Sequence, residues 1–289
     1  MNPHPTRRAR SLHLSWVGLI TCLASTAPSK AAATKGPPTP VPTAPDITAE
    51  ANHPGLTMQV VQHQGVRWTV ATVDLLKAHL VLLGQGAGAD KIHSYAALDK
   101  HLVATTGRRA ALVTNAGIFH PGHEPVGLHV EAGVTLQPVD RNEGDGNFYL
   151  LPNGVFSIDA TGAHVTPTAR WTAPKSGLIL ATQSGPLLLD GGAIHPKFNP
   201  DSPHRKIRSG VGISDPHTVH LALSHGPVRF HDAATLFRDV LGCAGALYLD
   251  GTISTMRSPL RPRARSHPGG YAGFLVVLEA ETRPPLEEP

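Results

Sequence analysis

The residues most able to do chemistry stand where expected strands end. Residues 246–249 are apolar, as is typical of a buried strand, and they run into a carboxylate at Asp250 and then into Gly251. A carboxylate at the end of a rigid strand, beside a glycine that lets a ligand approach the backbone, is one way to build a site. The same pair would also fit an aspartate that only caps a turn.

A second expected strand, residues 110–114, ends in the same manner at Asn115, with Gly117 and Phe119 close behind. The Asn115 amide offers both a donor and an acceptor, which suits sugar hydroxyls or phosphate oxygens. The alternative is that Asn115 bonds only its own turn.

A third expected strand, residues 178–182, leads into Gln183, Ser184 and Gly185. With the proline that follows, Ser184 and Gly185 predict a tight turn between two strands. Ser184 lacks the GxSxG context of a nucleophile elbow, so we do not expect it to attack a substrate.

Two arginines, Arg205 and Arg208, stand in a polar segment just before another expected strand. A guanidinium is a planar fork that matches two phosphate oxygens, so the pair could clamp a phosphate. The alternative is that both arginines lie in a loop exposed to solvent and bind no phosphate.

A metal site is another possibility, because His120, His123 and Glu124 lie close together in the sequence and could act as metal ligands. No further cluster completes a zinc-binding pattern. We therefore expect neither a metal nor another cofactor.

The N-terminus predicts export. Residues 1–27 have the basic, apolar and small-residue order of a signal peptide, and the apolar part is shorter than the ~20 residues of a spanning helix. We expect a periplasmic or secreted protein with no stable membrane span after cleavage. Arg7-Arg8 as a twin-arginine signal and Cys22 as a lipoprotein anchor are the alternatives.

The remaining chain predicts one domain. Residues 28–55 form a Pro/Ala/Thr-rich segment expected to be a disordered linker, residues 56–280 the folded domain, and residues 281–289 a disordered tail. The net charge of +4 comes without a basic stripe interleaved with aromatics, so nucleic acid is not an expected partner. Cys243 should be a buried small apolar residue.

The pattern of the domain is many short strands with few helices, which predicts an α+β fold around an antiparallel or mixed sheet. Helices are expected over 94–105, capped by Ser94 and ended by Gly107, and over 231–241, begun by His231 or Asp232. A hairpin is expected at Asn153-Gly154. The other expected strands are 57–61, 66–75, 79–83, 126–131, 147–151, 155–159, 211–214, 218–224 and 273–279.

Taken in order, the segments NAGIF, NGVF, ATQSGPLLL, the Arg-x-x-Arg pair before VGIS, and ALYLDGTIS resemble the phosphodiester glycosidase family. The resemblance covers about residues 70–278, and the family includes uncovering-enzyme-like proteins and a bacterial, exported YigE-like branch. It implies a hydrolase whose substrate is a sugar joined through its anomeric oxygen to phosphate, and which breaks the glycosidic bond.

The resemblance also implies roles. Asp250 would be the base for water or stabilise an oxocarbenium-like sugar, Arg208 would bind the phosphate, and Asn115 would complete the catalytic set. The residues expected to bind substrate are Gly117, Phe119, Gln183, Ser184, Gly185, Arg205, Gly251 and Ser254.

The sequence departs from the family pattern at two places. Ala116 stands where members have a second glycine, and Thr252 and Ile253 replace glycines between Gly251 and Ser254. Side chains there should narrow the pocket. The substrate then need not carry N-acetylglucosamine, and a phosphate-linked envelope glycan is our expectation. The alternative is a non-catalytic envelope protein that binds phosphorylated glycans.

Overall fold

The protein is dominated by β-sheet. The computed structural model describes residues 47–86, 91–175, 177–251, 253–264 and 266–280. Within these ranges the α-helices are α1 (Tyr95–Thr106) and α2 (Phe230–Thr235), with a 3₁₀ turn at Thr168–Arg170 and a π-helical turn at Leu236–Val240. The expected sheet core with few helices is confirmed, but strands exceed those of an ordinary α+β domain. The predicted signal peptide and tail lie outside the described residues.

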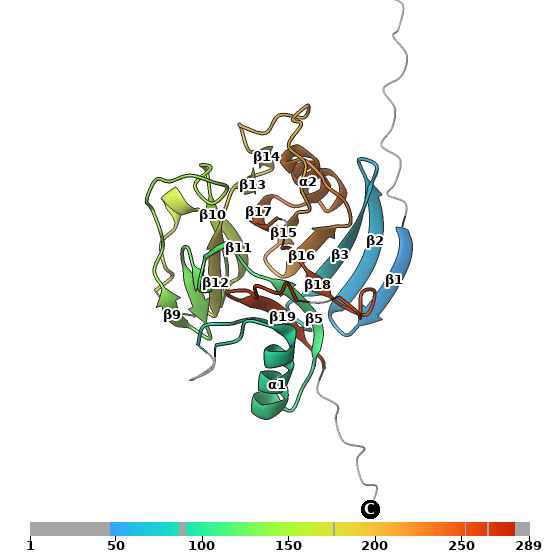
Figure 1. Cartoon of the computed structure of the whole chain (residues 1–289), viewed down its shortest axis with the longest axis vertical. Coiled ribbons are helices and arrows are strands. Elements are labelled where there is room, and N and C mark those ends of the chain that lie inside the picture. Colours follow the sequence, from blue (N-terminus) through green and yellow to red (C-terminus); the bar gives the residue numbers. More distant parts are fainter. Residues whose placement is uncertain (1–46, 87–90, 176, 252, 265, 281–289) are drawn as a thin grey trace, which may run out of the picture. The chain divides into compact units, whose positions relative to one another are not determined.

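The largest sheet is antiparallel, and the strand that ends at Asp250 is an inner strand with a neighbour on each side (Figure 1). Its order is β1 (Ile47–His53), β2 (Leu56–His63), β3 (Val66–Asp74), β16 (Thr218–Ser224), β15 (Ser209–Asp215), β17 (Gly245–Asp250), β13 (Leu187–Asp190) and β14 (Ala193–Ile194). Strand β1 corrects one boundary, because its backbone pairs with β2 although residues 47–53 were predicted to be linker. Pairing with a strand edge, which a composition argument does not detect, orders this segment.

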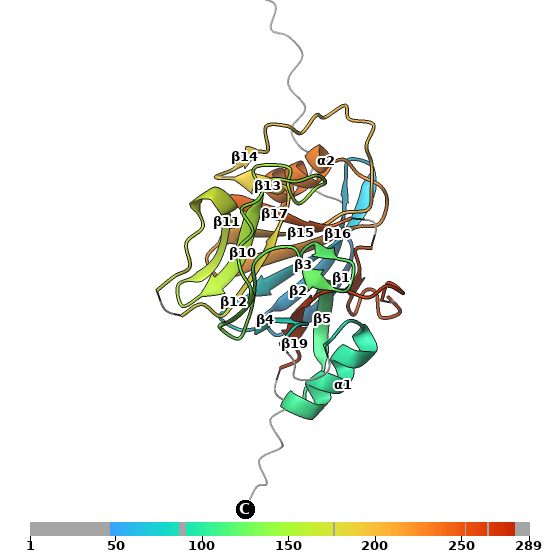
Figure 2. The same ribbon diagram turned by 60° about the vertical axis from the view of Figure 1, so that its left-hand side comes forward.

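Two smaller sheets, turned into view in Figure 2, and one two-stranded sheet complete the described part of the fold. One has the order β11 (Gly162–Pro167), β10 (Gly154–Asp159), β12 (Leu180–Ser184), β8 (His129–Glu131) and β9 (Val134–Gln137). The other has the order β18 (Met256–Arg257), β5 (Ala110–Asn115), β19 (Phe274–Leu278) and β4 (Leu80–Leu83), and β6 (Phe119–His120) pairs with β7 (Glu124–Pro125).

Strand β17 is buried on both faces. Leu247 and Leu249 point into the core between the sheets, whereas Ala246 and Tyr248 point into a second cluster that includes Phe237. The second cluster takes residues from α2, and a third packs α1 against β19. Both views show α1 and α2 at opposite ends of the fold. A strand covered on both sides is a rigid base for a carboxylate at its end.

The helix signals in the sequence are largely confirmed. Ser94 Oγ accepts a hydrogen bond from Ala97 N at 3.2 Å, and Gly107 ends α1 with φ 67°. The second helix begins earlier than predicted, because the Asp232 carboxylate accepts from Arg229 N at 3.0 Å, as the third residue of a capping box does. This helix continues as the π-helical turn rather than as α-helix to residue 241.

One strand prediction and one hairpin prediction around residue 150 are wrong. Residues 147–151 form a turn, because Leu150 N donates to Asn147 O at 3.2 Å and Asn153 Nδ2 donates to Phe148 O at 2.9 Å. These local bonds satisfy backbone groups that a sheet would otherwise pair. Gly154 is the first residue of β10, so the hairpin turn falls after Asp159 instead.

Two further expectations concern burial and membranes. Cys243 is 3% exposed, as predicted, and burial raises the pKa of its thiol to about 12. In the described part of the chain, no helix is long and apolar enough to cross a membrane.

Candidate active site

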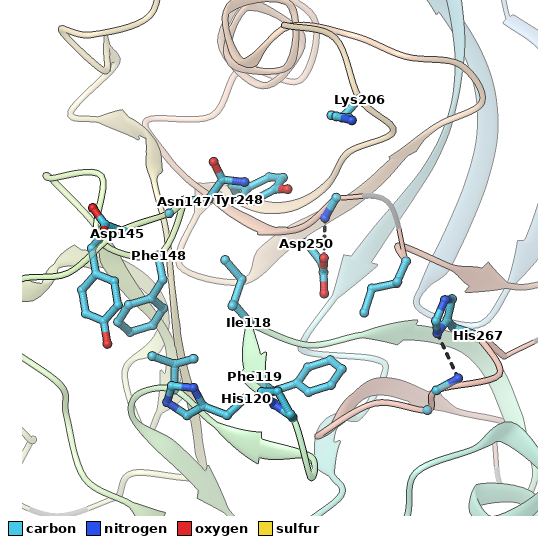
Figure 3. A pocket seen from close by; sticks show the side chains of 18 residues that line it. Ile118, Phe119, His120, Asp145, Asn147, Phe148, Lys206, Tyr248, Asp250 and His267 are labelled. Carbon is cyan, nitrogen blue, oxygen red and sulfur yellow. Dashed lines mark hydrogen bonds between the residues drawn. The ribbon is translucent and has the colours of Figure 1, made fainter.

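A cavity of about 740 Å³ opens at the end of β17 (Figure 3). Its wall comes from the β5–β6 connection, the turn around residue 147, the segment before β15 and the loop before β19. The lining residues are Ile118, Phe119, His120, Pro121, Val126, Asp145, Gly146, Asn147, Phe148, Tyr149, Lys206, Tyr248, Asp250, Gly251, Ile253, His267, Gly269 and Gly270. Apolar rings beside a few polar groups are typical of a small-ligand site.

Asp250 is the carboxylate at the strand end, and it points into the cavity. Burial raises its pKa to about 6, although a hydrogen bond of 2.5 Å from Gly251 N to Oδ1 opposes the shift. Among the described residues, no Lys, Arg or His lies within ion-pairing distance of this carboxylate. A carboxyl group that titrates near neutral pH can exchange a proton with a reacting group.

Tyr248 reaches the same cavity because strand residues two apart share a face. Its ring is 2% exposed, and burial raises the pKa of its hydroxyl. That oxygen lies 2.5 Å from where a β-carbon on Gly251 would sit. Gly251 is therefore required by close approach of the tyrosine.

Arg208, predicted to bind phosphate, lies behind the tyrosine rather than among the residues that line the cavity. It is 4% exposed, its Cζ stands 3.4 Å from the Phe230 ring centroid and 5.5 Å from that of Tyr248, and Nε donates to Val228 O at 3.0 Å. Burial lowers the pKa of Arg208, although Tyr248 and the charge of Asp232 oppose the shift. The guanidinium thus stacks on Phe230 and lies over the ring of Tyr248, so it packs behind the tyrosine.

Three of the predicted site residues line the cavity, namely Asp250, Gly251 and Phe119. Asn115 is 1% exposed and is used within the fold, where Oδ1 accepts from Thr255 N at 2.9 Å. This bond fixes the segment that follows Asp250. Asn115 is therefore a support of the cavity in this structure.

Gln183 and Ser184 are also buried supports. Gln183 Oε1 accepts from Leu128 N at 3.0 Å and Asp140 N at 2.9 Å, and Ser184 Oγ donates to Leu249 O at 3.0 Å. The Ser184 bond joins β12 to β17 one residue before Asp250. The predicted turn between two strands is confirmed at this point.

The predicted glycines serve close packing. A β-carbon on Gly117 would meet Gln183 O at 2.5 Å, and one on Gly185 would meet the backbone oxygen of Phe148. Two of the predicted ligand residues also lie apart from the cavity lining. Arg205 faces Asp232 at 3.7 Å, and Ser254 Oγ lies 2.9 Å from Ser209 Oγ.

No group of three or more metal-ligating side chains occurs among the described residues. His120 lines the cavity, whereas His123 stacks on His93 with 4.0 Å between ring centroids and bonds Gly269 O. Hence His120, His123 and Glu124 do not assemble a metal site.

Four residues that line the cavity were not predicted from the sequence, namely Tyr248, Lys206, Asn147 and His267. Alternation along β17 was the available signal for Tyr248, and the basic segment around Arg205 was the signal for Lys206. Asn147 and His267 lie in turns distant in sequence and carried no signal.

The comparisons with known proteins agree with one another. A family model described as phosphodiester glycosidase matches residues 108–268, more than half of the 289 residues. The uncharacterized protein YigE of Escherichia coli K12 is 34% identical over 145 residues, which are 50% of this chain and 57% of that protein. The zebrafish N-acetylglucosamine-1-phosphodiester alpha-N-acetylglucosaminidase catalytic domain, auto-inhibited by its pro-peptide, has a TM-score of 0.53 and 16% identity. That similarity covers 83% of this chain and 89% of the zebrafish one, and it shows a shared fold.

Proposed function

The chain belongs to the phosphodiester glycosidase family, and from this premise we propose that it hydrolyses the glycosidic bond of a sugar-1-phosphodiester in the cavity at Asp250. The observation that carries the proposal is a half-buried carboxylate of raised pKa, at the end of a rigid strand, in a cavity of about 740 Å³. This is the chemistry expected of an acid–base group in a glycosidase.

In the proposed reaction, the Asp250 carboxylate accepts a proton as water attacks the anomeric carbon. The bond between that carbon and the phosphate oxygen breaks, so the free sugar and a phosphomonoester are the products. Phosphate is already a good leaving group, which makes a strong general acid less necessary than in ordinary glycosidases. Near pH 7 a carboxyl group of pKa about 6 is mostly ionised, as a base must be.

Lys206 is the cation proposed to face the leaving phosphate. It lines the cavity together with Asp250, and the backbone bonds Lys206 N to Val228 O at 3.1 Å and Val228 N to Lys206 O at 2.8 Å fix its segment. Phe119 and Tyr149, which are half-buried, offer apolar faces on which a sugar ring can stack.

A binding protein without activity is the second candidate, and one feature favours it. Ile253 lines the cavity at a position where the family resemblance leads us to expect glycine, so a side chain occupies space beside Asp250. Such a cavity could hold a phosphorylated glycan without turning it over.

The test uses the protein without residues 1–27 and a panel of sugar-1-phosphodiesters. We expect wild type to release free sugar and phosphomonoester, and Asp250→Asn to lower kcat by roughly 10²–10⁴-fold. The matched control is Asp190→Asn, another strand-end aspartate, which pairs with the exposed Arg170 outside the cavity. Saturable binding without turnover in wild type would favour the binding protein.

Export to the periplasm or beyond, and an envelope glycan as substrate, are part of the same proposal. They rest on the signal-peptide pattern of residues 1–27. The N-terminal sequence of the protein recovered from a periplasmic or culture fraction tests this part, and an intact N-terminus in the cytoplasmic fraction would contradict it.

A further inference from the structure

A second hollow, of about 430 Å³, lies beside β3 and β16. It is distinct from the cavity at Asp250, and its lining is polar and basic. We refer to it as the basic pocket, and its lining residues are Arg67, Ile207, Leu223, Ser224, His225, Ser254 and Arg261. Nothing in the proposed reaction uses it.

Positive charge gathers in the basic pocket without a compensating acid. Its lining includes Arg67, His225 and Arg261 but no Asp or Glu. Among the described residues, neither guanidinium has an ion pair or a side-chain hydrogen bond. Burial lowers the pKa of His225, and the charges of Arg261 and Arg67, which line the same hollow, lower it further. Unpaired guanidinium groups that converge on one hollow are suited to an anion.

The fold builds this cluster from three separate segments. Arg67 lies on β3 and His225 directly follows β16, and the two are tied by a hydrogen bond of 2.8 Å from His225 N to Arg67 O. Arg261 closes a turn in which its N donates to Ser258 O at 2.9 Å. The backbone bond between β3 and the residue after β16 fixes two of these segments together, and Arg261 lines the same hollow from its own turn.

Neutral hydrogen-bonding groups complete the pocket. Ser224 Oγ is 1% exposed and accepts from Arg208 N at 3.0 Å, so its own hydrogen remains to be donated. Ser254 adds a second hydroxyl, and His225 Nε2 is held 2.7 Å from Thr69 Oγ1. Charged forks together with hydroxyls are the donor set that phosphate and sulfate groups accept from.

The basic pocket is a neighbour of the cavity, on the other side of the turn that follows Asp250. Gly251 lines the cavity, Ser254 lines the basic pocket, and Ser254 N donates to Gly251 O at 2.8 Å across the turn. The segment before β15 also contributes to both hollows, because Lys206 lines the cavity and Ile207 lines the basic pocket.

We propose that the basic pocket is a second ligand site, which binds a phosphate or sulfate group through Arg67, Arg261 and His225. The ligand is either free inorganic anion or a phosphate group carried by a glycan chain. This proposal does not rest on hydrolysis at Asp250, because it follows from the basic pocket alone.

The first experiment titrates the protein without residues 1–27 with inorganic phosphate, by calorimetry and by NMR of the His225 ring. We expect saturable binding, a rise in the pKa of His225, and a loss of affinity of about tenfold or more in Arg67→Gln/Arg261→Gln. Arg263→Gln is the matched control, because Arg263 is exposed and outside the basic pocket. Circular dichroism checks that each variant is folded.

Two results would overturn the proposal. One is the absence of saturable binding up to about 10 mM phosphate, well above the dissociation constants of ordinary anion sites. The other is binding that the double variant retains but Lys206→Gln loses, because the anion would then lie in the cavity.

The second experiment separates the two sources of the anion and does not require turnover. If a phosphorylated oligosaccharide binds Asp250→Asn about tenfold more tightly than inorganic phosphate, and the two arginine substitutions remove that advantage, the ligand is a glycan phosphate. Equal affinity for the two probes, lost equally with the arginines, identifies free anion. Either result supports the basic pocket, whereas affinity for both that is independent of the arginines contradicts it.

Discussion

The hydroxyl oxygen of Tyr248 lies 2.5 Å from the position that a β-carbon on Gly251 would occupy. The ring that carries this oxygen is 2% exposed and packs edge-on against Phe230 at 4.9 Å between centroids, so it has little room to withdraw. The tyrosine and the glycine together hold the backbone next to Asp250, and the shape of the cavity depends on this contact.

Gly251→Ala should therefore destabilise the protein, by about 1–3 kcal/mol, as overpacking of a filled interior does. Tyr248→Phe removes the obstructing oxygen and should recover most of this loss in the double variant. Urea unfolding of the two single variants and the double variant measures the coupling free energy. Strictly additive losses would mean that the two groups do not compete for the same space.

The pH dependence of stability follows from Asp250. In the folded protein its carboxyl group keeps a proton up to about pH 6, whereas an ordinary aspartate loses it near 3.8. Between these values unfolding releases a proton, so the free energy of unfolding falls as pH rises, by up to about 3 kcal/mol. Asp250→Asn removes this cost and should be more stable than wild type at about pH 8, with no difference below about pH 4.

Thermal or urea unfolding of both proteins across this range measures the difference at each pH. Using the difference between the two proteins cancels the titration of other groups. A constant difference from about pH 4 to 8 would show that the folded protein does not raise the pKa of Asp250.

The pH dependence of activity should have the opposite slope. Because the base must be ionised, kcat/KM should rise with pH and reach half its plateau near pH 6, the pKa of Asp250. Initial rates with one sugar-1-phosphodiester between about pH 4 and 8 test this. Activity that instead falls above pH 6 would assign Asp250 the role of acid.

Phosphate recognition should depend on Lys206 rather than on Arg205. Lys206 lines the cavity, whereas Arg205 lies outside it and faces Asp232 at 3.7 Å. Lys206→Gln should raise KM for phosphodiester substrates by about tenfold, whereas Arg205→Gln should change it by less than about twofold. A larger rise in KM for Arg205→Gln than for Lys206→Gln would instead support phosphate binding by Arg205 and Arg208.

The sequence predicts the strand that ends at Asp250 because apolar content, carboxylate and glycine are all local features. Ser94 and Gly107 likewise bound α1 through bonds to residues three or four away. These predictions are confirmed because each depends only on residues within one turn or one strand.

The rest of the site depends on contacts that no local pattern records. Asn115, Gln183 and Ser184 were predicted to meet substrate, but each is a buried side chain whose hydrogen bonds join segments far apart in sequence. Their types suit a ligand and a buried hydrogen-bond network equally well. Lys206 and His267 lie in long loops, and only the path of these loops in the folded protein brings them to the cavity.

In the proposed reaction the bond broken is the glycosidic one, and the position of an isotope label in the products identifies that bond. The sugar-1-phosphodiester is hydrolysed by wild type in ¹⁸O-labelled water, and both products are analysed by mass spectrometry. Attack at the anomeric carbon beside Asp250 predicts that the label enters the sugar and is absent from the phosphomonoester. Label in the phosphomonoester would show attack at phosphorus and would contradict cleavage of the glycosidic bond.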